Sequence, residues 1–371
     1  MPQVRDVLNA INELAPWDLA ESWDNVGLQV GSSNRRIQKI MVALDISKEV
    51  IQEGLDNQVD GILVHHPLIF KPLSQVNPDS PVGNYITKLI KNDLFLITAH
   101  TNVDKAEKGL NQYLAEILDL NEIEPLEPAS RQVYKVVVFT PEDYLVKIRE
   151  VMTQTGAGVI GEYTGCSFGL KGTGTFKPSS ETDPFIGNHG EYTEVTEIRL
   201  EMVVEAKALS GVLKAVYSNH PYEEPAVDVY SLENNSNHGL GRIGVLSKPL
   251  LLKDLCTVVQ ERLVAQQLRV AGDLDKTVTK VAICSGSGGS LIKTAIRKNA
   301  DLYLTGDLDY HDFLNAKESG LAVIDAGHWA TEQGFISLLC NYLTKYFKED
   351  KDLTIVPSST IQAEPYLVLK K

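Results

Sequence analysis

A chain of 371 residues is too long for one ordinary hydrophobic core, so we expect two or three domains. Its hydrophobic fraction of 43% and charged fraction of 23% are typical of a soluble globular protein. The formal net charge of -14 at pH 7 argues against a surface for nucleic acid or anionic membrane, because such surfaces concentrate Lys and Arg.

The cysteines are widely spaced and form no C-x-x-C pair, so we expect reduced thiols and no disulfides; they are Cys166, Cys256, Cys284 and Cys340. The N-terminus lacks a basic segment followed by an apolar core, and no apolar run approaches the roughly 20 residues that span a bilayer. We therefore expect a cytoplasmic protein without a membrane partner.

The chain opens with apolar residues at helical spacing, which predict an amphipathic helix from Val4 to Leu14 that Pro16 closes. A polar, glycine-punctuated loop follows at residues 21–31. Trp23 and Asp24 could line a pocket there, or the indole could only anchor a turn.

From residue 37 the pattern alternates between strands and helices, which predicts a mostly parallel sheet. The predicted strands are residues 40–44, 61–64 and 94–99, and the predicted helices are residues 48–57 and 82–92. Because ligands of such sheets bind at the carboxyl ends of the strands, the residues that follow each strand are of most interest.

Two adjacent imidazoles, His65 and His66, follow the second of these strands, and Pro67 then ends regular pairing. They could converge on one centre as the strand gives way to a loop; alternatively, one caps the loop and the other packs in the core. Asp104 comes shortly after the third strand, at the same edge of the sheet. Its alternative role is to cap a helix at residues 109–118.

The composition changes after a proline-containing acidic stretch at residues 120–131, which we interpret as a linker. The segments that follow are strands at 134–139, 195–204 and 227–232, helices at 142–154 and 206–219, and a Gly/Ser/Thr-rich stretch at 156–190. This is the β-α-β-β-α-β order of a ferredoxin-like α+β domain, inserted between two α/β halves. Within it, residues 220–225 (HPYEEP) could bind a metal, although the two prolines favour a structured turn.

The α/β pattern returns after a polar link at residues 234–237, with a strand at 244–246, a helix at 251–264 and a strand at 278–284. The last strand runs into SGSGGS at residues 285–290. Backbone amides at Gly286 and Gly288 could hold a phosphate, or the segment could be a plain tight turn.

Residues 300–307 repeat the layout of residues 59–66, with an acid, an apolar strand and polar residues at its end. We therefore expect two related halves that face one another across a cleft. Asp307 and His311 could support the site from outside, or they could be a helix start with a surface histidine.

His328 and Glu332 lie four residues apart at the start of a helix that we expect to reach about Phe347. The pair could clamp a metal or form an exposed contact. Because it follows a strand, as the other candidates do, we favour the clamp.

Together, His65, His66, Asp104, His328 and Glu332 offer three imidazoles and two carboxylates, a set that suits zinc, iron, manganese or cobalt. Five ligands exceed a structural tetrahedral site and cannot fill two coordination shells, so we expect two divalent ions with open positions. A bridging carboxylate such as Glu332 and an activated water then favour metal-assisted hydrolysis.

The motifs at residues 23–27 (WDNVG), 64–67 (VHHP), 100–104 (HTNVD), 306–311 and 327–332 (GHWATE) resemble those of the NIF3-like family, also called the GTP cyclohydrolase I type 2 family. The match follows the family order over the whole length, and the middle segment resembles the PII/CutA-like insert of the longer bacterial members. The resemblance implies a NIF3-like core at residues 1–130 and 238–371 with the insert at 131–237. It also implies a dinuclear site on the five residues and a ring-shaped homohexamer.

The family name suggests hydrolysis of a nucleotide-like substrate such as GTP, but nothing else in the chain selects a purine. In this interpretation Glu332, His311 and Asp307 take part in catalysis. The candidates for substrate binding are Trp23, Asp24, His100, Asn102, Gly286 and Gly288. A non-catalytic metal-binding ring with a ligand-sensing insert and a metal-dependent phosphoesterase remain as alternatives.

Overall fold

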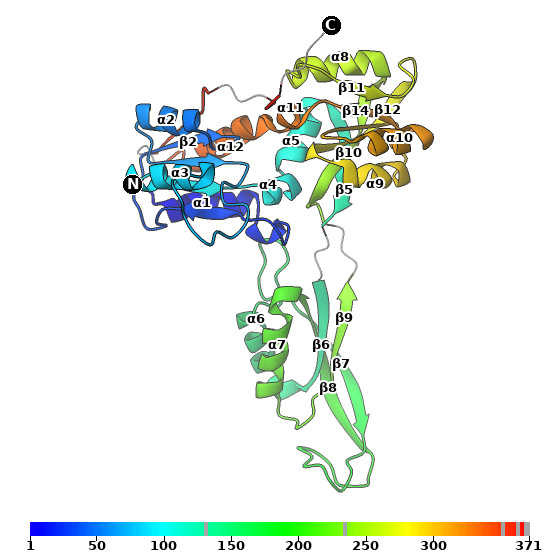
Figure 1. Ribbon diagram of the computed structural model, residues 1–371. Helices are drawn as coiled ribbons and strands as arrows, with labels where there is room; N and C mark the ends of the chain where they lie inside the picture. The colour runs from blue at the N-terminus through cyan, green and yellow to red at the C-terminus, as the bar shows by residue number, and fades with distance from the viewer. Residues whose placement is uncertain (130–132, 233–235, 350–352, 361–363, 367–371) are drawn as a thin grey trace. The chain divides into compact units, whose positions relative to one another are not determined.

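The computed structural model describes residues 1–129, 133–232, 236–349, 353–360 and 364–366. The chain forms two compact units, Met1–Ala129 with Asn237–Lys371 and Ser130–Ser236 (Figure 1). Among the described helices, none is long and apolar enough to cross a membrane. All four cysteines are free.

The first sheet of the larger unit has the strand order β1-β4-β3-β2-β15, in which β2, β3, β4 and β15 run parallel and β1 is antiparallel. Its strands are β1 (Gly27–Val30), β2 (Lys39–Ala43), β3 (Gly61–Val64), β4 (Phe95–Thr98) and β15 (Thr354–Pro357). Its helices are α1 (Val4–Leu14), α2 (Lys48–Asp56), α3 (Pro81–Lys91), α4 (Thr101–Lys105) and α12 (Gly334–Tyr346), with a 3-10 turn at Trp17–Leu19. Every residue of β3 is buried, as expected for a central parallel strand covered on both faces.

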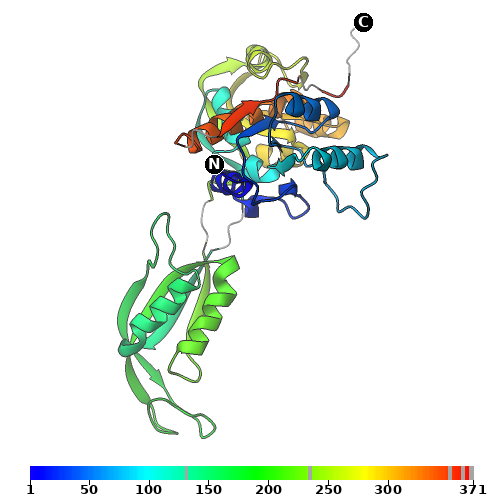
Figure 2. The same ribbon diagram turned by 90° about the vertical axis from the view of Figure 1, so that its left-hand side faces the viewer.

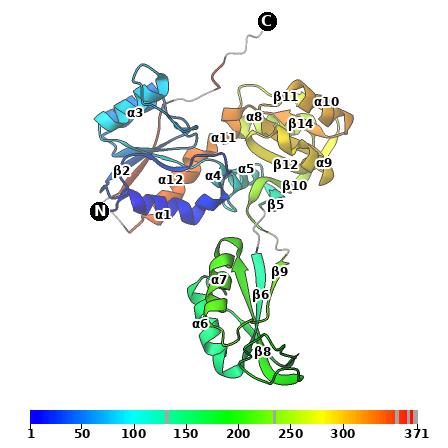
Figure 3. The ribbon, with the colours of Figure 1, turned by 60° about the horizontal axis from the view of Figure 1, so that its bottom comes forward.

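The second sheet has the order β11-β14-β13-β12-β10-β5, with β12, β13 and β14 parallel at its centre. Its strands are β5 (Leu120–Pro128), β10 (Gly239–Leu251), β11 (Arg269–Ala271), β12 (Thr277–Ser287), β13 (Leu302–Gly306) and β14 (Ala322–Asp325). The helices around it are α5 (Leu110–Ile117), α8 (Leu252–Arg262), α9 (Ile292–Arg297), α10 (Tyr310–Glu318) and α11 (His328–Glu332), with a 3-10 turn at Gly289–Leu291. The two sheets lie side by side, with α4, α5 and α11 between them (Figure 3).

The same hydrogen bonds recur at the start of the second parallel strand in each sheet. The Asp60 carboxylate accepts from the backbone N–H of Gln38 and Lys39 at 2.6 and 2.9 Å. The Asp301 carboxylate accepts from those of Thr279 and Lys280 at 3.0 and 2.9 Å. Asp60 and Asp301, the acids of the two similar segments at residues 59–66 and 300–307, therefore have the same local role.

The prediction of a linker at residues 120–131 is wrong for its described part, because residues 120–128 form β5, which pairs with β10. Pro125 and Pro128 are tolerated because β5 is an edge strand, whose outer side needs no N–H donors. Residues 130–131 of this prediction lie outside the described residues.

The predicted long C-terminal helix is divided at Gln333 into α11 and α12. Phe335, Leu339 and Leu343 of α12 pack into the core of the first sheet, and β15 then pairs with β2. The last part of the chain therefore completes the first sheet, although it follows the second in sequence.

The smaller unit contains β6 (Val133–Pro141), α6 (Leu145–Gln154), β7 (Phe168–Phe176), β8 (Thr193–Glu205), α7 (Ala206–Asn219) and β9 (Val227–Leu232), with a 3-10 turn at Glu142–Tyr144. Its sheet has the order β7-β8-β6-β9 with all pairs antiparallel. The two helices cover one face of this sheet (Figure 2), and Ile148, Met152, Val212 and Val216 fill the core between them.

Candidate metal centre

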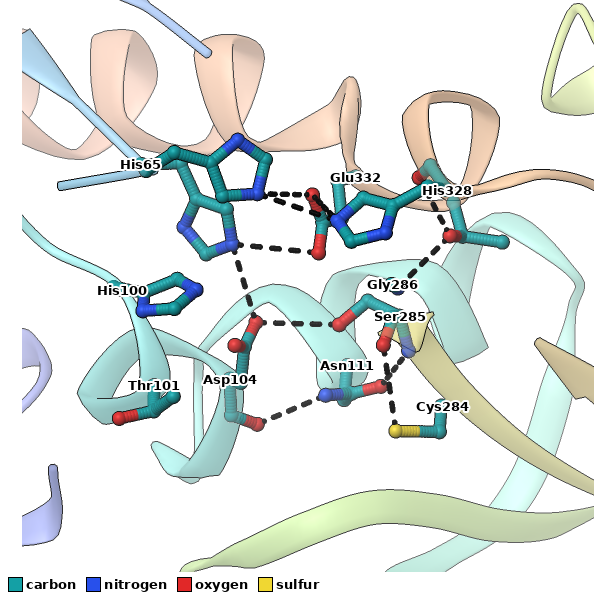
Figure 4. A network of polar contacts seen from close by, with 12 residues as sticks. His65, His100, Thr101, Asp104, Asn111, Cys284, Ser285, Gly286, His328 and Glu332 are labelled. Carbon is teal, nitrogen blue, oxygen red and sulfur yellow. Dashed lines mark hydrogen bonds and ion pairs between the residues drawn. The ribbon is translucent and has the colours of Figure 1, made fainter. Parts of the chain in front are cut away.

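His65 and His66 leave β3 through the same acceptor, since both backbone N–H groups donate to Leu44 O, at 3.0 and 3.1 Å. The buried His65 ring lies 2.9 Å, through Nδ1, from the carbonyl of Ala99. A carbonyl can only accept, so His65 Nδ1 carries a proton, and in the neutral imidazole Nε2 is the lone-pair nitrogen. This nitrogen points toward Glu332 and Asp104 (Figure 4).

His66 and His328, like His65, are oriented through Nδ1, but their partners are carboxylates outside the cluster. His66 Nδ1 lies 2.8 Å from Asp45 Oδ1, and His328 Nδ1 lies 2.6 Å from Asp307 Oδ2. The two Nε2 atoms are then 3.3 Å apart. Histidines that bind metals commonly have such an outer partner, which fixes the tautomer and the ring orientation.

Glu332 is 3% exposed and faces all three imidazoles. Its Oε2 lies 3.0 Å from His66 Nε2 and 3.1 Å from His328 Nε2, and its Oε1 lies 3.7 Å from His65 Nε2. At Gly286, which has φ +60°, a Cβ atom would lie 2.2 Å from Glu332 Oε1. A side chain at residue 286 would therefore displace the Glu332 carboxylate from this position.

Asp104 lies in α4, directly after β4, and is 7% exposed. Its Oδ1 lies 3.7 Å from His65 Nε2 and accepts a hydrogen bond from Ser285 Oγ at 3.2 Å. The N-cap of α5 is Gly109, so the structure does not support the capping alternative for Asp104. The carboxyl ends of β3, β4, β12 and β14 thus contribute to one cluster.

Without a metal, the imidazoles compensate the charge of the buried carboxylates. Burial disfavours protonated His66, but the adjacent Asp45 and Glu332 carboxylates outweigh this effect and raise its pKa to about 10. Burial likewise opposes protonation of His328, yet Glu332 and Asp307 raise its pKa to about 9. Despite its burial, the pKa of Glu332 is well below its usual value, chiefly because of His65.

The donor set fits a metal ion on two independent grounds. His65 Nε2 and Glu332 Oε2 are buried and have no hydrogen-bond partner within the described residues, so a cation would satisfy both. The 3.3 Å spacing of His66 and His328 Nε2 matches two ligands of one tetrahedral ion, which lie about 3.4 Å apart when each bond is about 2.1 Å. When His66 and His328 are neutral, their Nε2 lone pairs face Glu332 Oε2 at short distance. A cation between these atoms would remove the repulsion.

Metal affinity is expected to rise with pH between 6 and 8, because the ion must displace protons that His66 and His328 hold below pKa values of about 10 and 9. With two protons released, the apparent association constant should rise up to about a hundredfold per pH unit. Competition with a chromophoric chelator of known pH dependence measures this rise. An affinity that does not change with pH would show that neutral imidazoles already face the ion.

Asp24 and His100 lie beside the cluster. Asp24 Oδ1 is 2.9 Å from His100 Nδ1, and its Oδ2 accepts from the Thr101 N–H at 3.1 Å and from its hydroxyl at 2.5 Å. Although burial opposes ionisation, these bonds lower the pKa of Asp24 to about 2. A ring nitrogen of His100 lies within 4.8 Å of ligand atoms of His65 and His66.

Other residues assigned to the site by sequence occupy structural positions. Asn102 is fully buried; its Oδ1 accepts from the His100 N–H at 3.0 Å and its Nδ2 donates to Ala15 O at 2.8 Å. The Gly288 carbonyl accepts from Tyr303 Oη at 2.7 Å. The Gly286 N–H donates to Thr331 Oγ1 at 3.0 Å, so it is not available to an anion.

His311 and Trp23 lie at the surface. His311 is exposed and stacks edge-on against Tyr310, with no contact to the cluster among the described residues. Trp23 is 55% exposed, and its ring centroid lies 5.7 Å from that of Phe70 and 6.2 Å from that of His100. Of these two, only Trp23 is close to the cluster.

Sequence reasoning missed Asp45 and Ser285, the polar groups that support His66 and Asp104. Asp45 follows β2, so the expectation that polar residues at the carboxyl ends of parallel strands form the site could have identified it as well. It also missed Arg242, whose guanidinium is buried and donates to Gly239 O, Gly241 O and Ala106 O at 2.7, 2.8 and 2.6 Å. No local pattern indicates this residue, because the contact that joins it to the end of α4, at Ala106 O, is distant in sequence.

The fold and the cluster define an α/β protein with a His/carboxylate centre that could bind metal. A model of the Duf34/NIF3 family (NGG1p interacting factor 3) matches residues 2–364. A Bacillus subtilis protein named GTP cyclohydrolase 1 type 2 homolog is 40% identical over 328 residues, which cover 88% of each chain. A Halalkalibacterium halodurans protein of the same name is 38% identical over 362 residues, 97% of each chain.

Solved structures agree over the full length. The crystal structure of a Bacillus cereus protein related to NIF3 aligns with a TM-score of 0.76 at 36% identity, over 99% of each chain. That of a Staphylococcus aureus protein aligns with a TM-score of 0.84 at 28% identity, also over 99% of each chain. This chain belongs to the Duf34/NIF3 family, which confirms the resemblance seen in its motifs.

Proposed function

We propose that the protein is a dinuclear metal-dependent hydrolase of a nucleotide-like substrate. The observation that carries the proposal is the convergence of three imidazole Nε2 atoms and two buried carboxylates, with His65 Nε2 and Glu332 Oε2 unpartnered among the described residues. Two overlapping groups of possible ligands, His65/His66/His100 and His66/His328/Glu332, share His66, which favours more than one ion, although we assign His100 to proton transfer rather than to the ligand set. We expect zinc, iron or manganese, held by His65, His66, Asp104, His328 and Glu332.

When bound, the ions would supply Lewis acidity and lower the pKa of water at their open positions. The protein's own contribution is to fix the ligands and to manage protons. With Nδ1 held by Asp24, the His100 imidazole can accept a proton at Nε2 beside the cluster. The exposed Trp23 ring, which lies 6.2 Å from the His100 ring and is tilted by 54° to the Phe70 ring, offers an apolar face on which a nucleobase could stack.

The test is to load the purified protein with Zn²⁺, Mn²⁺ or Fe²⁺, incubate it with GTP and measure formate and phosphate separately. Formate release that Trp23→Ala weakens through KM would support the hydrolase and a stacked base. Phosphate release alone would favour the phosphoesterase. Bound metal without turnover of any nucleotide or phosphoester would favour a non-catalytic metal-binding ring.

Three further features belong to this proposal. The β-α-β-β-α-β order and antiparallel sheet of the smaller unit support a ferredoxin-like insert. We also propose the homohexamer that the resemblance in the motifs implies, which light scattering on the purified chain would test. A cytoplasmic location accords with the lack of a membrane-spanning helix among the described residues.

A further inference from the structure

The smaller unit has a cavity of its own, with a volume of about 410 Å³. It lies where the ends of β7 and β8 meet two loops, residues 177–190 and the HPYEEP turn at 220–225. The volume falls within the range that holds a small organic molecule. The function proposed for the metal cluster does not use this cavity.

Aromatic rings form much of the wall. Tyr222, in the turn, lies with its ring centroid 6.4 Å from that of Phe176 and 6.1 Å from that of Phe185, at interplanar angles of 49° and 45°. Phe139 of β6 completes this wall. Rings tilted by these angles do not stack on one another, and aromatic rings that line a cavity can attract cations through their π faces.

The polar groups at the cavity are acidic. Asp183, Glu197, Glu223 and Glu224 line it, whereas its described lining contains no Lys, Arg or His. Arg199 is a nearby cation, but it is paired with Glu201 at 2.8 Å and lies over the ring of Phe139. The charge of the cavity is therefore negative.

Glu197, on β8, is a half-buried carboxylate of this wall. A Cβ atom at Gly174, on the neighbouring strand, would lie 2.2 Å from Glu197 Oε2, so glycine there makes room for the carboxylate. The Tyr222 hydroxyl is buried and has no hydrogen-bond partner within the described residues. Burial and the nearby Glu197 carboxylate raise the pKa of Tyr222, although the two groups are not in hydrogen-bonding geometry.

The turn itself does not offer a metal site. His220 Nε2 lies 3.0 Å from Phe139 O, and His220 Nδ1 accepts from the Tyr222 N–H at 3.1 Å, so both ring nitrogens are used. Glu223 Oε2 accepts from the Asp183 N–H at 3.0 Å and joins the turn to the loop. The histidine fixes the turn, and the turn presents Tyr222.

We propose that this cavity binds a small organic cation with an apolar body, such as an aromatic amine or a quaternary ammonium compound. The π faces and carboxylates would attract the positive charge, and the apolar wall would cover the body of the ligand. The Tyr222 hydroxyl supplies one directional contact, as donor or acceptor. The smaller unit is thereby a ligand-binding module, separate from the metal cluster.

The experiment is calorimetric titration of the full-length protein with benzyltrimethylammonium, benzyl alcohol and phenylacetate, which share a phenyl ring but carry positive, zero and negative charge. The cation should bind once per chain, about tenfold more tightly than the alcohol, and phenylacetate should not bind. Glu197→Gln should weaken cation binding about tenfold and leave the alcohol unaffected. Glu194→Gln, on an exposed residue of the same strand outside the cavity, is the matched control.

Three results would overturn the proposal. They are no binding of the cation up to about 10 mM, binding of phenylacetate as tight as that of the cation, or unchanged cation affinity in Glu197→Gln. The comparison of the three ligands uses the unmodified protein, so it holds even if a variant folds poorly.

Discussion

Glu332→Gln is expected to remove most of the bound metal while leaving the fold intact. Glu332 lies within 3.7 Å of three imidazole nitrogens, and an amide cannot supply the negative charge that holds cations beside them. Loss of an outer partner of a ligand typically costs tenfold to a hundredfold in metal affinity, so loss of a ligand should cost at least about a hundredfold. Mass spectrometry of metals on purified protein measures the change.

The matched variants for this experiment are Glu318→Gln and Asp45→Asn. Glu318 is exposed on α10, so its variant should keep the metal content of the unmodified protein. Asp45 orients His66 at 2.8 Å, so its variant should bind metal about tenfold to a hundredfold more weakly. Full metal content in Glu332→Gln would show that Glu332 is not a ligand.

Arg242→Met is expected to lower the free energy of unfolding by about 3–5 kcal/mol. Arg242 is 1% exposed, and its guanidinium donates to the backbone of both β10 and the end of α4. Methionine fills similar space but leaves these buried carbonyls without donors. Because α4 carries Asp104, metal affinity should fall as well.

Denaturant unfolding of the metal-free protein measures this effect, with Arg36→Met at an exposed position as control. The control should change the free energy of unfolding by no more than about 0.5 kcal/mol. Arg242→Lys should give an intermediate loss, since an ammonium keeps the charge but cannot reach all the carbonyls. Equal stability of Arg242→Met and the unmodified protein would mean that water replaces the guanidinium.

The cluster could be predicted because its members follow strands in sequence. His65 and His66 follow β3, Asp104 follows β4, and His328 follows β14. The sequence does not reveal which ring nitrogen faces inward. That depends on Ala99 O, Asp45 and Asp307, which meet the rings only when the strands are in register.

The sequence by itself determined the parallel strands, the polar residues at their carboxyl ends and the family, because these depend on local periodicity and on motifs. Only the tertiary structure decided that residues 120–128 form an edge strand and that α12 and β15 complete the first sheet. The edge strand β5 and the return of the C-terminal segment to the first sheet both depend on pairing between residues far apart in the chain. Such pairing is set by which apolar faces meet in the fold, and no local pattern records it.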